Sequence, residues 1–192
     1  FKGALRLHLD PSTKGMRIND PKELQIYQQA VDEFGSDELA IIYIHDQELF
    51  SHRKLALLES LVFGLEEVKG ISKVESLFTT NDFVVEEGAL SVAPLLAWPP
   101  ESEDEARTAK ARALKNPIFR DSLVSGDGTS MAITLLLDLD KEDERAHPKL
   151  TRDIKKLIEP LRDDFEQIFQ FGNPYIETVI GTLLFKDQMT LV

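Results

Sequence analysis

The strongest constraint on the fold is one stretch, residues 37–78, in which two extended runs flank a segment with an apolar stripe. Residues 39–44 are almost continuously apolar and rich in β-branched side chains, with charges on both sides. This pattern is typical of a strand buried on both faces. Residues 71–78 predict a second strand. A strand, a crossover helix and a strand in this order should form a right-handed unit whose two strands run parallel.

The segment between these two strands predicts an amphipathic helix. Ser51 can cap it, because a serine hydroxyl accepts a hydrogen bond from a free backbone amide of the first turn. Gly70 ends the helical pattern. Five apolar residues recur at helical spacing and make one buried stripe: Leu55, Leu58, Leu61, Val62 and Leu65.

Helices and a strand are also predicted on either side of this unit. Residues 1–9 alternate apolar and polar side chains, as an amphipathic strand does. Residues 21–34 predict a helix capped by Asp20, with a proline at its first position. Residues 101–115 predict a helix capped by Ser102, with acids in the first turn and bases in the last.

The C-terminal third predicts a hairpin and a long helix. Residues 122–125 and 130–139 are expected to be strands around the turn 126–128, whose glycines would supply positive φ angles. Residues 148–171 predict the longest helix, and Pro160 should kink it because proline removes one backbone donor.

The order of these elements predicts an α+β fold, a mixed sheet of about four to six strands with helices on one face. The ferredoxin-like split βαβ topology is the nearest simple arrangement. We divide the chain into residues 1–36, a central domain at 37–173, and an apolar-rich end segment at 174–192. The domain carries an insertion at residues 79–100.

Part of this insertion is uncharged. Residues 89–100 hold three prolines and the only tryptophan, and prolines there disfavour both a helix and a central strand. Loops normally run over a wet surface, so this irregular segment either lines an apolar cavity or closes the core. The cavity reading gives apolar wall candidates and polar candidates that could bond a lone hydroxyl or head group. The wall candidates are Phe83, Leu95, Leu96, Trp98 and Phe119, and the polar candidates are Asn81, Asn116 and Tyr175.

Charge and composition exclude several function classes. The formal net charge is −12, from 34 acidic and 22 basic residues, so the surface should repel polyphosphate and nucleic acid is not an expected partner.

The chain has no cysteine, and its four histidines show no ligand spacing. Residues 138–144 resemble a calcium loop but lack its glycine and its final glutamate. We expect neither a metal nor another cofactor.

The end of the first buried strand is the natural place to look for catalysis. His45 and Asp46 lie there, and Ser51 and His52 follow. A Ser-His-Asp triad is recognised by its geometry, and Ser51 already has a role as a helix cap. We therefore expect no enzymatic activity. A small hydrolase using His45 and Ser51 is the remote alternative.

Four motifs occur in a fixed order. The first is Phe-Gly-Ser-Asp-Glu-Leu at 34–39. The second spans 49–77 and consists of Leu-Phe-Ser, a leucine-rich helix and Val-Lys-Gly-Ile-Ser-Lys-Val-Glu-Ser-Leu. The third is the segment 109–117, which ends in Asn-Pro, followed by Leu-Val-Ser-Gly-Asp-Gly-Thr at 123–129, and the fourth is Gly-Asn-Pro at 172–174, followed by Asp187. Together they resemble the first extracytoplasmic loop of resistance-nodulation-division (RND) transporters. The most similar branch is the lipid and hydrophobe exporters that include hopanoid transporters. Lys69 stands where that family often has proline, and residues 89–100 have no close counterpart.

The resemblance implies a porter-type domain of ferredoxin-like architecture on the periplasmic side of a bacterial inner membrane. Both ends of the chain would continue into membrane helices, and the domain would perform no covalent chemistry. Its cargo would be a hydrophobic lipid such as a sterol or hopanoid. Its partners would be its own transmembrane domain, a second extracytoplasmic loop and a periplasmic adaptor or carrier. The alternative is a structural module that docks an adaptor or a neighbouring protomer.

Overall fold

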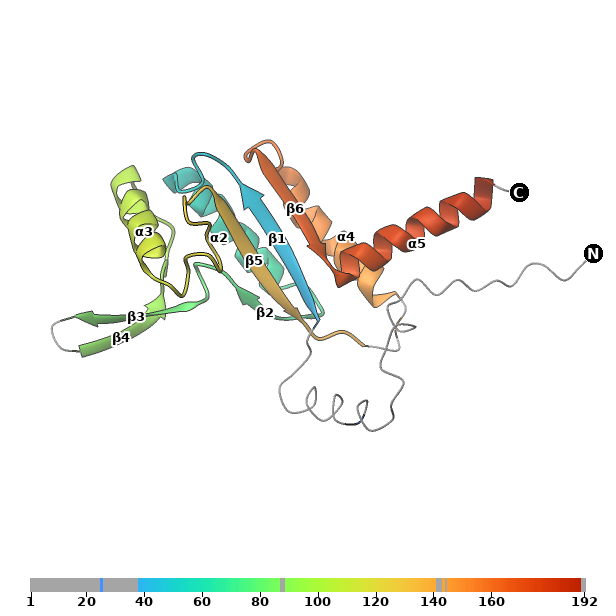
Figure 1. Ribbon diagram of the computed structural model, residues 1–192, viewed down its shortest axis with the longest axis horizontal. Coiled ribbons are helices and arrows are strands. Elements are labelled where there is room, and N and C mark those ends of the chain that lie inside the picture. The colour runs from blue at the N-terminus through green and yellow to red at the C-terminus, as the bar shows by residue number, and fades with distance from the viewer. Residues whose placement is uncertain (1–24, 26–37, 87–88, 141–142, 144, 191–192) are drawn as a thin grey trace, which may run out of the picture.

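The computed structural model describes residues 25, 38–86, 89–140, 143 and 145–190 (Figure 1). The strand and helix predicted for residues 1–36 lie outside this part of the chain, apart from Gln25.

A four-stranded sheet forms the centre of the molecule. Its order is β2-β5-β1-β6, with β1 at Leu39–His45, β2 at Ile71–Glu75, β5 at Ser130–Leu137 and β6 at Gln167–Gly172. All three pairings between neighbours are antiparallel. Because β5 lies between them, β1 and β2 run parallel without touching, as a split βαβ unit requires.

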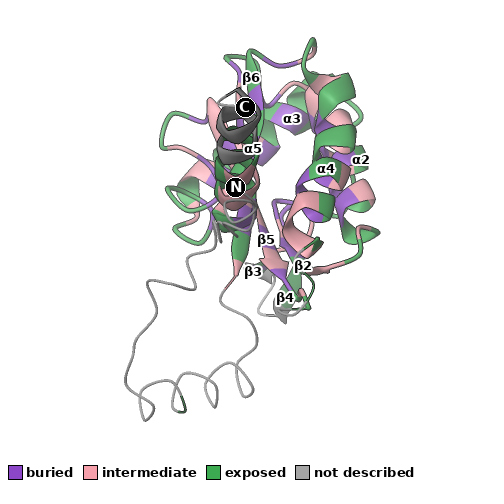
Figure 2. Ribbon diagram, turned by 90° about the vertical axis from the view of Figure 1, so that its right-hand side faces the viewer, coloured by how far each residue is buried: buried purple, intermediate pink, exposed green. Residues whose placement is uncertain are grey.

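Helix α2 (His52–Glu66) connects β1 to β2, and helix α4 (Ala146–Ile158) connects β5 to β6. Both helices lie on the same face of the sheet (Figures 1 and 2). This is the ferredoxin-like topology, so the predicted α+β class and split βαβ arrangement are confirmed. The expected mixed sheet has antiparallel neighbours throughout, because β5 is inserted between the two parallel strands.

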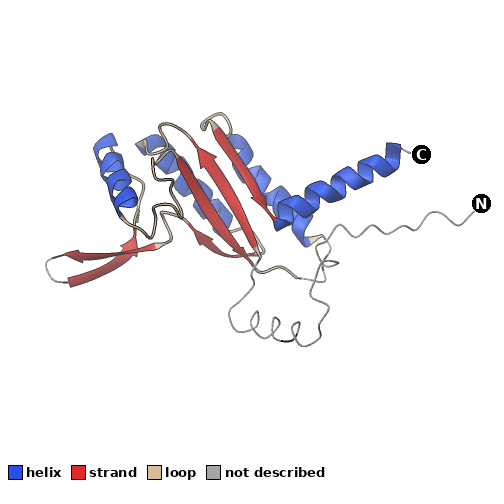
Figure 3. Cartoon of the chain, viewed as in Figure 1, coloured by secondary structure: helices blue, strands red, loops and turns tan. Residues whose placement is uncertain are grey.

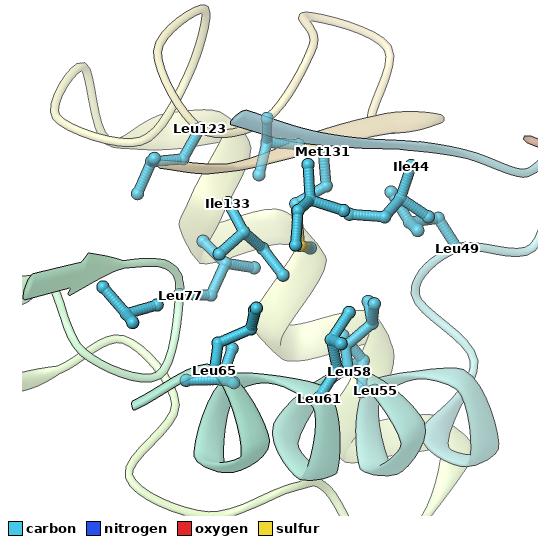
Figure 4. Packing of buried hydrophobic residues seen from close by; sticks show 14 of the residues in the cluster. Ile44, Leu49, Leu55, Leu58, Leu61, Leu65, Leu77, Leu123, Met131 and Ile133 are labelled. Atoms are coloured by element: carbon cyan, nitrogen blue, oxygen red, sulfur yellow. The ribbon is translucent and has the colours of Figure 1, made fainter. Parts of the chain in front are cut away.

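The core lies between this face of the sheet and α2. All five residues of the predicted helix stripe are buried, and Figure 4 shows Leu55, Leu58, Leu61 and Leu65 turned toward Ile44, Met131 and Ile133 of the sheet. The second face of β1 is only half-buried, at Ile41, Tyr43 and His45. The prediction that this strand is buried on both faces was therefore wrong, because α2 and α4 share one side.

An excursion separates β2 from β5. It holds the strands β3 (Asn81–Glu86) and β4 (Ala89–Pro94) and helix α3 (Glu103–Lys115) (Figure 3). Residues 89–100 were expected to be irregular, yet the first six form β4. That expectation was wrong because β4 belongs to a two-stranded sheet, where Pro94 stands at a strand end and breaks no interior ladder.

The long helix predicted for residues 148–171 was also wrong. Helix α4 ends at Ile158, a 3₁₀ turn follows at Glu159–Leu161, and β6 begins at Gln167. Pro160 therefore helps to end the helix instead of kinking it. In β6, Ile168 and Gln170 are buried while Phe169 and Phe171 are exposed, which is the two-residue period of a strand.

Helix α5 (Asn173–Thr190) follows β6 directly. None of the helices in the described part of the chain combines the length and the apolar character that crossing a bilayer requires.

Four local predictions have mixed outcomes. Ser102 caps α3 by accepting a hydrogen bond from the Glu105 amide at 3.3 Å, as predicted. Ser51 stands at the N-cap of α2, but its hydroxyl makes no capping bond. Residues 122–125 form turns with isolated bridges in place of the predicted strand. Of the two glycines in the following turn, only Gly128 has a positive φ.

Candidate functional site

The β3–β4 hairpin projects from the body of the protein and forms a sheet of its own (Figure 1). Phe83 pairs with Val92 across the two strands, and these side chains are 58% and 50% exposed. An isolated two-stranded hairpin is only marginally stable in water. This hairpin therefore presents apolar surface that burial against another molecule would stabilise.

The base of the hairpin is fixed to α3 by a polar network. The Asp82 carboxylate is buried and accepts hydrogen bonds from Asn116 Nδ2 at 2.6 Å and Arg112 Nη2 at 3.1 Å. Asn116 Oδ1 accepts in turn from the Ile118 amide at 2.9 Å. Both polar ends of Asn116, a predicted ligand-binding residue, thus have partners within the protein. The network holds the hairpin's base, while Phe83 and Val92 stay exposed.

The predicted apolar wall residues lie in two environments. Leu95, Leu96 and Phe119 belong to the buried core. Phe83 is exposed on β3, and Trp98 is 77% exposed on the segment that follows β4. The fold therefore brings three of the five into the core and leaves the two aromatic side chains Phe83 and Trp98 on the surface.

The remaining polar candidates are far apart. Asn81 is exposed at the start of β3, and Tyr175 is exposed on α5. The hairpin and α5 extend from opposite ends of the molecule (Figure 1), so Asn81 and Tyr175 do not converge. The ligand-binding role of all eight candidates stays a prediction. Val92, the exposed partner of Phe83, was not among them, and the β3–β4 pairing is the signal that identifies it.

The His45 end of β1 carries a hydroxyl–imidazole–carboxylate string, although not with Ser51. His45 Nδ1 shares a 3.0 Å hydrogen bond with Ser130 Oγ, and its Nε2 lies 3.5 Å from Glu166 Oε2. Such strings can activate a nucleophile. Here the Tyr43 hydroxyl also bonds Ser130 Oγ at 3.0 Å, and the Ser130 amide donates to Ser125 Oγ instead of facing an oxyanion. The arrangement favours a structural role.

Asp46 lies beside this string and is buried. It forms an ion pair with Lys54 and accepts from the amides of Glu48 at 2.7 Å and Glu166 at 3.2 Å. These contacts join the ends of β1, α2 and the β6 approach. Within the described residues, no cluster of three or more His, Cys, Asp or Glu side chains could hold a metal ion.

His147, in the first turn of α4, connects three elements. Its Nδ1 lies 2.6 Å from Glu177 Oε2 of α5, and its Nε2 lies 3.4 Å from Glu38 Oε2 just before β1. The hydrogen bond to Glu38 raises the pKa of His147, burial lowers it, and Glu177 raises it, so that the net pKa lies above its usual value. Sequence spacing gave no sign of this cluster, because its members are far apart in the chain.

This raised pKa gives a pH-dependent contribution to stability. The contribution should be fully present below about pH 6.5, the unfolded value, and be lost as pH rises through the higher folded pKa. We expect the difference in melting temperature between the wild type and His147→Gln to shrink from pH 6 to pH 9. His52→Gln, at an exposed pair with Glu103, is the matched control. A difference that does not change with pH would contradict the charged His147 cluster.

The sequence matches no protein-family model and no curated protein.

Proposed function

We propose that this chain is an extracytoplasmic, porter-type domain of an RND-family transporter, on the periplasmic side of a bacterial inner membrane. The proposal rests on the order of motifs in the sequence and on a fold of the expected class. The single observation that supports it most is that the excursion inserted between β2 and β5 of a ferredoxin-like frame leaves the apolar side chains of Phe83, Val92 and Trp98 exposed. We propose that this domain binds a hydrophobic lipid, such as a sterol or hopanoid.

Trp98 and Phe83 are the residues proposed to contact such a cargo. Both are large apolar side chains left mostly in water, and covering each would contribute roughly 1.5–3 kcal/mol. Burying ~300 Å² of a polycyclic skeleton at ~25 cal/mol/Å² contributes ~7 kcal/mol before ordering costs, which sets an upper limit on affinity in the micromolar range.

The sole tryptophan makes this proposal directly measurable. We expect the Trp98 emission to shift to the blue and saturate when the 192-residue chain is titrated with a hopanoid or a sterol delivered from cyclodextrin. Phe83→Ser should weaken the binding several-fold. Phe63→Ser, at an exposed residue of α2, should leave it unchanged. If no lipid shifts the emission, and native mass spectrometry detects no bound lipid, the cargo proposal fails.

A second candidate function is docking of another protein, favoured by the hairpin itself. β3 and β4 pair only with each other among the described strands, and their exposed apolar pair stands away from the core. Exposed strand edges of this kind are able to pair with a strand of another chain.

A further inference from the structure

We propose that the β3–β4 hairpin binds a basic, extended segment of a partner protein, which adds to one outer edge as a third strand. This inference rests on the second candidate function, docking, and is independent of lipid binding. Three observations support it, namely the unprotected strand edges, the local charge and the exposed apolar pair.

Within the part of the chain that the structure describes, the outer edges of the hairpin lack the usual protection against strand addition. The register runs without interruption over six pairs, from Asn81 with Pro94 to Glu86 with Ala89, so no bulge twists either edge away. Proteins commonly guard an edge with lysines, prolines or bulges. Here neither strand contains a lysine, and the one proline stands at the end of β4. Continuous edges that no other described strand covers bind extended peptides through main-chain hydrogen bonds.

The negative charge around the hairpin indicates that the partner segment is positively charged. No lysine or arginine occurs between Lys73 and Arg107, while eight acidic residues do. Asp82 is neutralised by Arg112 at the hairpin base, but Glu86 ends β3 and Glu87 follows it in the sequence. A second copy of this chain, with its own net charge of −12, would be repelled, and so would an anionic bilayer. A segment with basic side chains would be attracted.

The exposed pair selects the apolar part of the partner. Phe83 and Val92 lie opposite each other and therefore occupy one face of the hairpin. A strand added at either edge alternates its side chains between the two faces, so every second residue could extend this apolar patch. The partner segment should thus alternate apolar and basic residues over about six positions, the length of the hairpin strands.

The test uses a fluorescein-labelled peptide, acetyl-Lys-Val-Lys-Val-Lys-Val-Lys-amide, and the 192-residue chain. We expect saturable binding by fluorescence anisotropy that weakens when salt is raised from 50 to 300 mM. Hydrogen exchange should slow at amides of residues 81–94. The double variant Phe83→Ser, Val92→Ser should weaken binding at least tenfold, and Glu86→Lys should weaken it mainly at low salt. Phe63→Ser and a peptide with glutamates in place of the lysines are the controls.

Each other outcome overturns the inference in a recognisable way. Absent binding, or binding that the double variant does not change, would remove the hairpin as the site. Protection confined to residues outside 81–94 would do the same. If the double variant instead abolishes concentration-dependent self-association, a second copy is the occupant, and docking survives while the basic partner does not. If it abolishes only the response of Trp98 to lipid, both the inference and the docking function fail.

Discussion

Replacing Phe119 with alanine is expected to lower the free energy of unfolding by about 3–5 kcal/mol. The Phe119 side chain is 0% exposed. Its carbonyl also accepts hydrogen bonds from the amides of Leu123 and Val124, both at 2.9 Å, so the ring sits on a closed turn that cannot easily collapse. Removing the ring leaves a cavity whose cost adds to the lost transfer free energy. Urea denaturation followed by circular dichroism measures the effect.

The Phe119→Ala variant also tests whether Phe119 fills the core or lines a ligand pocket. If Phe119 only closes the core, adding lipid should not restore the stability of Phe119→Ala relative to the wild type. Phe63→Ala is the matched control, because that ring is 57% exposed and its loss should change the free energy of unfolding by about 0.5 kcal/mol or less. A loss below about 1 kcal/mol at Phe119 would contradict its place in the core.

The central unit could be predicted from sequence because its signals are local. The apolar residues from Leu55 to Leu65 recur at helical spacing, which predicts one buried face of a helix. The β-branched residues of β1 favour a strand. Both signals can be read within a few neighbouring residues. The split topology was predicted from the order of these elements, although a long excursion separates β2 from β5.

Strand β6 could not be predicted in the same way. Ile168 and Phe169 are adjacent apolar residues, and together with Phe165 they also fit one side of a helix. The segment is a strand because it pairs with β1, and this pairing places Phe169 opposite Tyr43 with ring centroids 5.2 Å apart. Such a cross-strand contact depends on a segment more than a hundred residues away, and it overrides local preference.

The candidate site was partly predictable for a similar reason. The uncharged composition of residues 89–100 identified an unusual segment, but composition cannot separate buried from exposed members of it. Leu95 and Leu96 turn into the core, while Trp98, two residues later, lies in solvent. The Leu96 amide donates a hydrogen bond to the Leu77 carbonyl at 3.0 Å, which fixes this part of the chain against the core. It joins two segments that sequence periodicity does not relate.

Replacing Asp46 with alanine is expected to cost about 2–4 kcal/mol of the free energy of unfolding. The variant leaves the largely buried Lys54 ammonium without its carboxylate, and it leaves the amides of Glu48 and Glu166 without their acceptor. A buried charge that loses its partner retains its desolvation cost. The loss falls below that of a fully enclosed pair because Lys54 keeps some contact with water and with the Phe165 ring, 5.9 Å away.

The pH dependence of this loss tests its electrostatic origin. Burial raises the pKa of Asp46, but the Lys54 ammonium and the two amides outweigh burial and hold the pKa below its usual value. The stabilisation by Asp46 should therefore be fully present above about pH 3.9, the unfolded value, and be lost as pH falls through the lower folded pKa. The difference between the wild type and Asp46→Ala should stay constant from pH 7 to pH 5 and narrow below pH 4.

A double-mutant cycle separates the ion pair from the two amide bonds. Lys54→Met keeps the aliphatic stem over Phe165 and removes the charge, so the cycle with Asp46→Ala isolates the carboxylate–ammonium coupling. We expect a coupling of about 1–3 kcal/mol that salt weakens little, because burial limits screening. Suppose instead that the coupling is near zero while Asp46→Ala still loses about 2–4 kcal/mol of the free energy of unfolding. In that case Asp46 stabilises the fold through its hydrogen bonds to the two backbone amides alone, and its ion pair with Lys54 contributes nothing measurable.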